Sequence, residues 1–187
     1  CLYAQSRVNR NFNKYTKVRT ARNVTGAQVA LQLLDAQGLY DVEVEETQGF
    51  LSDHYDPRGK VLRLSPDVYR TPSIAAAGVA AHEMGHALQD AGGYFPLQIR
   101  SALVPAAQFG SSFAPWLFIG GLLLNFTSLA WIGVIMFAAA VLFTLVTLPV
   151  EFDASYRRAL PVLEAGRFIP EKDMPAAREI LRAAAFT

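Results

Sequence analysis

Residues 101–150 contain no charged side chain, although Arg100 and Glu151 flank them directly. This run is too long for a single membrane span, because a hydrocarbon core of roughly 30 Å takes about 20 helical residues. The polar sequence Asn125-Phe126-Thr127-Ser128 divides the run, so we expect spans near Ala102–Leu124 and Leu129–Val150. The sequence therefore predicts a helical hairpin in a membrane, with both of its outer ends on one side.

Outside this run the charge content is that of an ordinary soluble domain. The net charge of +1 gives no indication of nucleic-acid binding. The single cysteine, Cys1, excludes an internal disulfide framework and is weak evidence for a reducing compartment. The chain begins without methionine and ends in an apolar tail, which is consistent with truncation at both ends.

The first 22 residues form a basic segment without a single acid. Beside a membrane, such a segment is typical of a cytoplasmic flank attracted to anionic lipid, although a merely solvated basic helix has the same composition. Arg157 and Arg158, after the second span, indicate the same orientation. The cations of the segment are Arg7, Arg10, Lys14, Lys17, Arg19 and Arg22.

The soluble part mixes helix and strand patterns. Thr25–Gln37 predicts a short helix with Thr25 as a cap and Gly38 as a stop, while 41–47 and 60–65 alternate like strands of a small sheet. Pro72-Ser73 opens an alanine-rich helix that we expect to run to about Ala91.

The candidate metal-binding and catalytic residues lie on this last helix. His82 and His86 are four residues apart and therefore project from one face, where both imidazoles can hold one zinc ion. Glu83, one step round the helix, can take a proton from a zinc-activated water as it attacks a peptide carbonyl, and pass that proton to the leaving amine. Two core or surface histidines are the plain alternative.

A catalytic zinc of this type needs a third protein ligand. His54 and Glu151 are the candidates, and Glu151 is favoured because the hairpin returns the chain to the side that it left. A carboxylate at a membrane exit is otherwise often just an interfacial anchor.

Three segments carry a family resemblance: Ala81-His82-Glu83-Met84-Gly85-His86-Ala87, Leu51-Ser52-Asp53-His54-Tyr55-Asp56-Pro57 and Leu148-Pro149-Val150-Glu151-Phe152-Asp153-Ala154-Ser155. They resemble the YugP-like neutral zinc metallopeptidases of bacterial membranes and, more distantly, the HtpX-like membrane proteases.

The resemblance implies a gluzincin-type zinc endopeptidase in which His82, His86 and Glu151 are ligands and Glu83 is the catalytic acid/base. Many gluzincins have an aspartate four residues after the ligand glutamate, where this chain has Ser155. Asp153 is the nearest acid, so we expect it to orient a histidine ligand.

Other residues have weaker claims. Lys60–Ser65 resembles the edge strand on which zincins lay an extended substrate, although a plain sheet edge has the same pattern. His54 and Tyr55 either polarise an oxyanion or structure a turn, and the turn is the favoured interpretation. Tyr69 and Tyr94 are similar candidates.

The sequence thus predicts an α+β fold: a small zincin-like catalytic domain with a short sheet and a metal-binding helix, plus a transmembrane hairpin. We expect a basic juxtamembrane arm at 1–22, the N-terminal part of the catalytic domain at 23–100, the two-span hairpin at 101–150 and a C-terminal helical part at 151–187.

The predicted function is hydrolysis of membrane or membrane-adjacent polypeptides by a Zn²⁺ enzyme of the bacterial inner membrane, with its catalytic domain in the cytoplasm. Membrane lipid is an expected partner and nucleic acid is not, while membrane-protein partners and a homo-oligomer stay open. An intramembrane protease is disfavoured because Gln89 and Asp90 follow the motif and the apolar stretch Ile74–Ala81 is too short to cross. A non-catalytic zinc-containing membrane scaffold is the alternative function.

Overall fold

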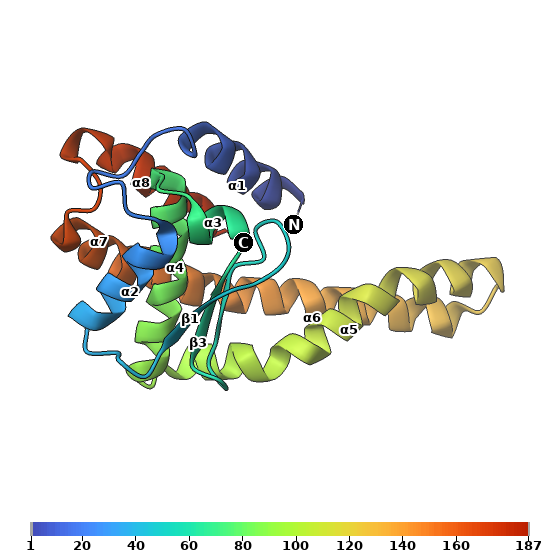
Figure 1. Ribbon diagram of the computed structural model, residues 1–187. Coiled ribbons are helices and arrows are strands. Elements are labelled where there is room, and N and C mark those ends of the chain that lie inside the picture. The colour runs from blue at the N-terminus through green and yellow to red at the C-terminus, as the bar shows by residue number, and fades with distance from the viewer. Residues whose placement is uncertain (1, 187) are drawn as a thin grey trace. The chain divides into compact units, whose positions relative to one another are not determined.

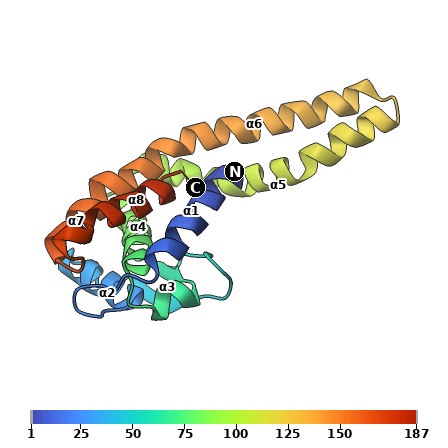
Figure 2. The ribbon, with the colours of Figure 1, turned by 90° about the horizontal axis from the view of Figure 1, so that it is seen from above.

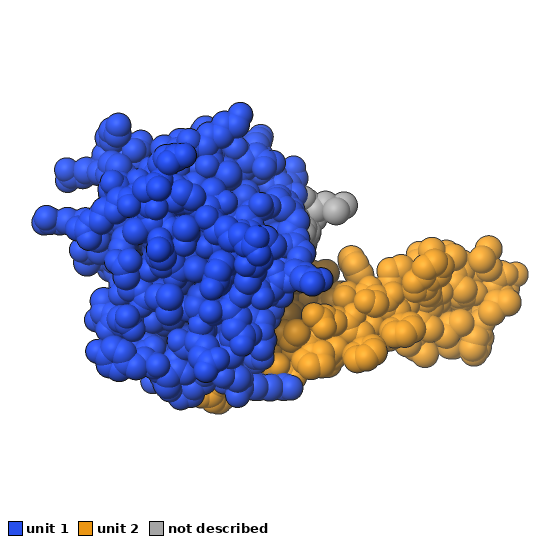
Figure 3. Space-filling view, viewed as in Figure 1, with its two compact units in different colours: residues 1–94, 151–187 blue, residues 95–150 orange. Residues whose placement is uncertain are grey.

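The computed structural model describes residues 2–186, so Cys1, together with the predictions that depend on it, lies outside the described residues. The chain forms two compact units (Figure 3). Unit 1 comprises two segments of the chain, one up to Tyr94 and one from Glu151 onward. Unit 2 is the segment between them, Phe95–Val150.

Helix α4 (Ile74–Ala91) lies in the middle of unit 1 (Figure 1). Ser73 caps its first turn by accepting a hydrogen bond from the Ala76 amide, and Gly92 ends it, as the sequence predicts. Nearly every residue of α4 is buried, because its alanines and glycines let other elements approach closely. Its principal neighbours are α2 (Gly26–Ala36), α8 (Met174–Ala184) and the π-helix η1 (Asp153–Ala159).

Local sequence signals also define α2. Thr25 and Gln28 form a reciprocal capping box, and Gly38 beyond the helix has a φ of 74°, a conformation that glycine adopts without strain. Leu33 and Leu34 of this helix are buried in the core of unit 1. The short helices α3 (Pro66–Arg70), α7 (Leu160–Gly166) and η2 (Glu171–Asp173) complete the unit.

The sheet has three strands in the order β1-β3-β2. Strand β1 (Glu43–Glu46) pairs in parallel with β3 (Val61–Leu64), and β2 (His54–Asp56) pairs with β3 in antiparallel fashion. The prediction that Lys60–Ser65 forms an edge strand is therefore wrong. Both sides of the β3 backbone are occupied by neighbours, so β1 and β2 form the two edges of this sheet in the described part of the chain.

The basic N-terminal segment folds as part of unit 1. Helix α1 (Leu2–Tyr15) lies beside α8 (Figure 2), and Phe12 is buried in the core. The chain then continues with backbone hydrogen bonds from the Thr20 amide to the Pro72 carbonyl and from the Ile74 amide to the Val18 carbonyl. Contact of this segment with anionic lipid stays a prediction.

Unit 2 is a hairpin of two long helices, α5 (Phe95–Leu123) and α6 (Thr127–Phe152), of which α6 ends two residues beyond the unit. Both helices are long and apolar enough to be candidate membrane spans. The turn between them has Asn125 at a φ of 50°, at the polar break expected from the sequence. Near this turn the helices are in close contact, because a Cβ on Gly133 would lie 2.7 Å from the Phe118 amide nitrogen.

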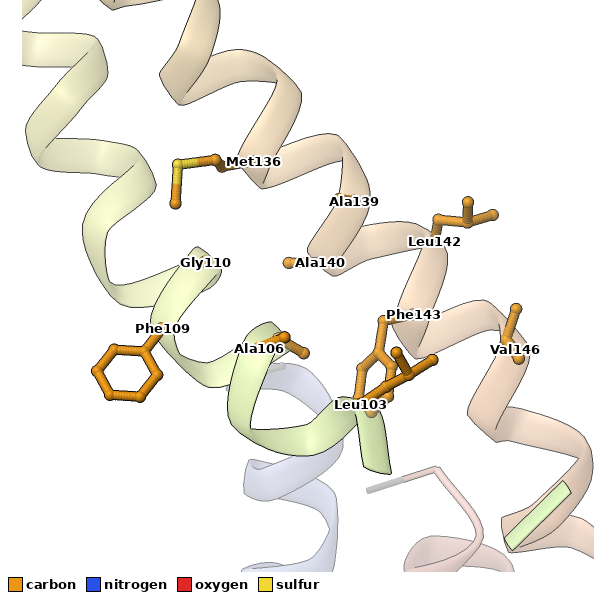
Figure 4. Close-up of a pocket in the computed structure, with 11 residues that line it drawn as sticks. Leu103, Ala106, Phe109, Gly110, Met136, Ala139, Ala140, Leu142, Phe143 and Val146 are labelled. Carbon is orange, nitrogen blue, oxygen red and sulfur yellow. The ribbon is translucent and has the colours of Figure 1, made fainter. Parts of the chain in front are cut away.

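Elsewhere the hairpin helices leave a cavity of about 440 Å³ between them. Its lining is apolar, with Leu103 and Gly110 on α5 facing Met136, Ala140 and Phe143 on α6 (Figure 4). Large apolar side chains also cover the outer surface of the hairpin, including Trp116 and Trp131. Such a surface fits lipid contact better than water contact.

The fold is mixed α+β, as the sequence predicts, and the described residues are mainly helical.

Candidate metal centre

Three buried side chains meet in unit 1. His82 and His86 lie one turn apart on α4, and Glu151 comes from the end of α6, just before η1. The Glu151 Oε2 atom lies 3.2 Å from His82 Nε2 and 3.3 Å from His86 Nε2. Each of the three residues is at most 5% exposed. Burying two imidazoles and one carboxylate away from water costs free energy unless the three groups bind a common ligand or pair with an opposite charge.

The donor atoms suit a zinc ion. Zinc binds histidine nitrogen and carboxylate oxygen at about 2.0–2.2 Å in tetrahedral geometry, which places neighbouring donors about 3.3 Å apart. The two measured separations agree with this spacing. The structure therefore brings together the three residues predicted as ligands, and their chemistry fits the metal.

The other nitrogen of each imidazole is also engaged. His82 Nδ1 lies 2.8 Å from the Ser155 Oγ atom on η1, and His86 Nδ1 lies 2.9 Å from Gln89 Oε1, one turn further along α4. Such contacts hold the rings in place and leave the Nε2 atoms directed at Glu151. Ser155, four residues after Glu151, thus contacts a histidine itself.

Asp153 is connected to the candidate metal centre by hydrogen bonds through Gln89. The Gln89 Nε2 atom donates to Asp153 Oδ2 at 2.9 Å, and Arg158 Nε donates to the same oxygen at 2.8 Å. Arg158 also donates from Nη1 to the Leu88 carbonyl near the end of α4, at 2.7 Å. The expected orienting acid is therefore linked to His86 by an intervening amide.

Gly85 lies between the two histidines and allows η1 to approach α4. A Cβ at this position would overlap the Ala154 carbonyl oxygen and lie 2.9 Å from its carbon. Since Ala154 lies between Asp153 and Ser155, the absence of a side chain at Gly85 sets the distance between the histidines and the groups that support them.

Glu83 is 8% exposed and lies near Asp53. Burial raises the pKa of Asp53 to about 6; a hydrogen bond from the Ser65 amide opposes this shift, and the negative charge of Glu83 adds to it. The Asp53 carboxylate accepts hydrogen bonds from the Ser65 amide at 2.7 Å and from the Ser65 hydroxyl at 3.0 Å. Asp53 therefore holds the loop before β2 against the end of β3, close to the predicted catalytic glutamate.

Comparison with known proteins adds the family. Residues 1–187 match the family model described as "Putative neutral zinc metallopeptidase". The chain is also 47% identical to the "Putative membrane protease YugP" of Bacillus subtilis (strain 168), over 99% of this chain and 82% of that protein. The chain belongs to the neutral zinc metallopeptidase family. No solved structure matches it.

The resemblance to YugP-like metallopeptidases is thereby confirmed. The family description names zinc, and the buried cluster of His82, His86 and Glu151 fits a metal site.

The structure leaves His54 out of the cluster of His82, His86 and Glu151. His54 is exposed on β2, and its Nδ1 atom lies 2.8 Å from the Ser52 carbonyl oxygen. The Tyr55 hydroxyl donates to Asp90 at 2.8 Å, which ties β2 to the end of α4. Both residues thus lie on a strand and not in a turn, and an oxyanion role for either of them stays a prediction.

Sequence reasoning missed Gln89 and Arg158 as parts of the centre. The signal for Gln89 was present, because it lies three residues after His86 and therefore on the same helix face. Arg158 gave no such signal, since its contact with Asp153 depends on the geometry of η1.

Proposed function

We propose that this protein is a membrane-anchored zinc endopeptidase of the gluzincin type, with a zincin-like catalytic domain. The observation that carries the proposal is the buried cluster of His82, His86 and Glu151, whose donor atoms have the spacing of a zinc site. His82, His86 and Glu151 would hold the ion. When bound, zinc supplies Lewis-acid chemistry, which lowers the pKa of water toward about 7 and polarises a carbonyl.

Glu83 is the general base and acid in this proposal. Its carboxylate takes a proton from water while the water oxygen forms a bond to the peptide carbonyl carbon. The same carboxylate then delivers the proton to the amine nitrogen as the carbon–nitrogen bond breaks. Near-complete burial of Glu83 keeps bulk water from competing for that proton.

The substrates in this proposal are membrane or membrane-adjacent polypeptides, and the hairpin is the anchor in the bacterial inner membrane. The supporting observation is that Glu151, a proposed metal ligand, lies on the same helix as a candidate membrane span. We place unit 1 in the cytoplasm because Arg157 follows that span and is exposed.

Metal content and cleavage of casein or membrane peptides by detergent-purified protein test the catalytic proposal. Wild type is compared with Glu83→Gln and Glu151→Ala. We expect one zinc per chain in wild type and in Glu83→Gln, cleavage only in wild type, and loss of metal mainly in Glu151→Ala. Metal in all forms without cleavage by any of them would instead favour a structural zinc site in a membrane scaffold.

Substrate choice is tested separately. We expect purified wild type in lipid bilayers to cut membrane-anchored peptides faster than the same peptides free in solution. Equal rates for both would remove the support for a membrane-restricted substrate.

A further inference from the structure

Gln89 is fully buried between the metal centre and a charged pair. We propose that Gln89 is a positioning residue that fixes the ring tautomer of His86, and that Asp153 and Arg158 set the direction of its amide. The inference rests on the proposed zinc site and is independent of peptide cleavage.

The direction of the amide follows from Arg158. A guanidinium group can only donate hydrogen bonds, and Arg158 donates to Asp153 Oδ2 at 2.8 Å and to the Leu88 carbonyl at 2.7 Å. The Asp153 oxygen therefore acts as an acceptor. Gln89 lies 2.9 Å from the same oxygen, so the group that it presents there must be its NH₂.

The opposite end of the amide then fixes His86. With the NH₂ on Asp153, the Gln89 carbonyl oxygen is the atom at 2.9 Å from His86 Nδ1. A carbonyl oxygen can only accept, so Nδ1 carries the hydrogen. In the neutral ring Nε2 is then the nitrogen with a free lone pair, which is the form that binds a metal. This Nε2 atom is the one that faces Glu151.

The two histidines differ in this respect. His82 Nδ1 contacts the hydroxyl of Ser155, which can either donate or accept, so this contact alone leaves the His82 tautomer open. The series of hydrogen bonds from Arg158 through Asp153 and Gln89 to His86 thus fixes the tautomer of one proposed ligand before the metal binds. It also joins α4, which carries both histidines, to η1, which begins two residues after Glu151.

Gln89→Met is the first test, because methionine has about the length of glutamine but lacks both polar groups of the amide. We expect the Kd for zinc, measured by competition with a fluorescent chelator in detergent-purified protein, to rise roughly 10- to 100-fold. The matched control is Gln32→Met on the exposed side of α2, which should leave the Kd unchanged. Wild-type affinity in Gln89→Met would overturn the proposal.

The tautomer is read by ¹⁵N NMR of metal-free Glu151→Ala protein with labelled histidine at a pH where the rings are neutral. The Glu151 carboxylate is removed for this test because it lies 3.3 Å from His86 Nε2 and would compete with Gln89 for the imidazole hydrogen. The chain has three histidines, so His54→Asn and His82→Asn suffice to assign the signals. We expect His86 to be protonated on Nδ1 in this background and to lose this preference when Gln89→Met is added. An unchanged tautomer in the variant would contradict the inference.

A single and a double variant test the same proposal if Gln89→Met folds poorly. Gln89→Glu places a carboxylate against Asp153, and we expect zinc affinity to fall at least about tenfold. Adding Asp153→Asn removes the repulsion between the two carboxylates, and the carboxylate at position 89 can still accept from His86, so affinity and the Nδ1–H tautomer should both recover. Recovery of neither in the double variant would overturn the proposal, whereas absence of cleavage in wild type would count only against the proposed function.

Discussion

At the scale of single residues, Gly85 controls how closely η1 lies against α4. We expect Gly85→Ala to weaken zinc binding at least about tenfold, because the new methyl group displaces the Ala154 backbone and with it Ser155 and Glu151. Chelator competition measures the affinity. Gly85 is not a ligand in the proposed site, so the loss of zinc affinity would come from displacement of the neighbouring backbone.

The matched control is Gly78→Ala on the same helix. Its Cβ would lie 2.8 Å from Ile180 Cγ2 and 3.2 Å from Ile180 Cβ, so this variant also forces a displacement against α4, but one that does not involve the Ala154 backbone. Zinc affinity should stay within about twofold of wild type. Equal losses in both variants would show that general destabilisation of α4, and not the Ala154 contact, is responsible.

Asp53 should make stability depend on pH. Its folded-state pKa of about 6 is above the value near 3.9 of an unfolded chain, so the folded state holds the proton more tightly. This contribution is fully present below about pH 4 and is lost as the pH rises through 6. The loss has an upper bound of about 3 kcal/mol.

Asp53→Asn removes this titration while keeping a carbonyl oxygen for Ser65. Relative to metal-free wild type, we expect the variant to be more stable at pH 7.5 than at pH 4.5, measured by thermal unfolding in detergent. Asp35→Asn, on an exposed part of α2, controls for loss of a carboxylate. A wild-type-to-variant difference that is the same at both pH values would contradict the assignment.

At the scale of elements, the π-helix η1 decides which side chains meet. A π-helix bonds residue i to residue i+5, whereas an α-helix bonds i to i+4. Accordingly Asp153 makes its short contact with Arg158, five positions on, while Arg157, four positions on, is 4.0 Å away and exposed. An ordinary α-helical register would favour the pair Asp153–Arg157.

The sheet is joined to α4 by the hydrogen bond of Tyr55 with Asp90. Burial raises the pKa of Tyr55 and so does this hydrogen bond, so the hydroxyl keeps its proton and donates. We expect Tyr55→Phe to cost about 1 kcal/mol in the free energy of unfolding, because one hydrogen bond is lost and the ring remains. Denaturant unfolding measures this, and zinc affinity should not change. A large drop in zinc affinity would assign Tyr55 to the metal centre.

At the scale of the whole molecule, the metal should join the two chain segments of unit 1. Two of the proposed ligands precede the hairpin and the third, Glu151, follows it, so zinc binding at this site would add to folding stability. At a zinc concentration about 1,000 times the Kd, the gain is about 4 kcal/mol, or roughly 10 °C in Tm. Chelation should lower the Tm of wild type by this amount and leave Glu151→Ala unaffected. An equal shift in both proteins would exclude this site as its source.

The hairpin also makes a prediction for the bilayer. The two tryptophans of the chain, Trp116 and Trp131, are 75% and 62% exposed on α5 and α6. In vesicles of lipids with brominated acyl chains, we expect strong quenching of intrinsic fluorescence, because both indoles would contact lipid. Trp116→Phe and Trp131→Phe separate the two signals. Emission that is the same in brominated and ordinary lipid would argue against a membrane-spanning hairpin.

Much of this protein follows from sequence because the physics involved is local. The uncharged run predicts the two hairpin helices, helical periodicity places His82 and His86 on one face of α4, and the capping box of Thr25 marks the start of α2. Each of these features depends on residues within a few turns of one another.

Tertiary structure decided what depends on distant partners. It placed β3 in the middle of the sheet, since strand order depends on pairing across many residues and no local pattern encodes it. It brought Glu151, and not His54, beside the histidines. It also directed Asp153 to His86 through Gln89, because the π-helical register and the packing of Ala154 on Gly85 set which groups can touch.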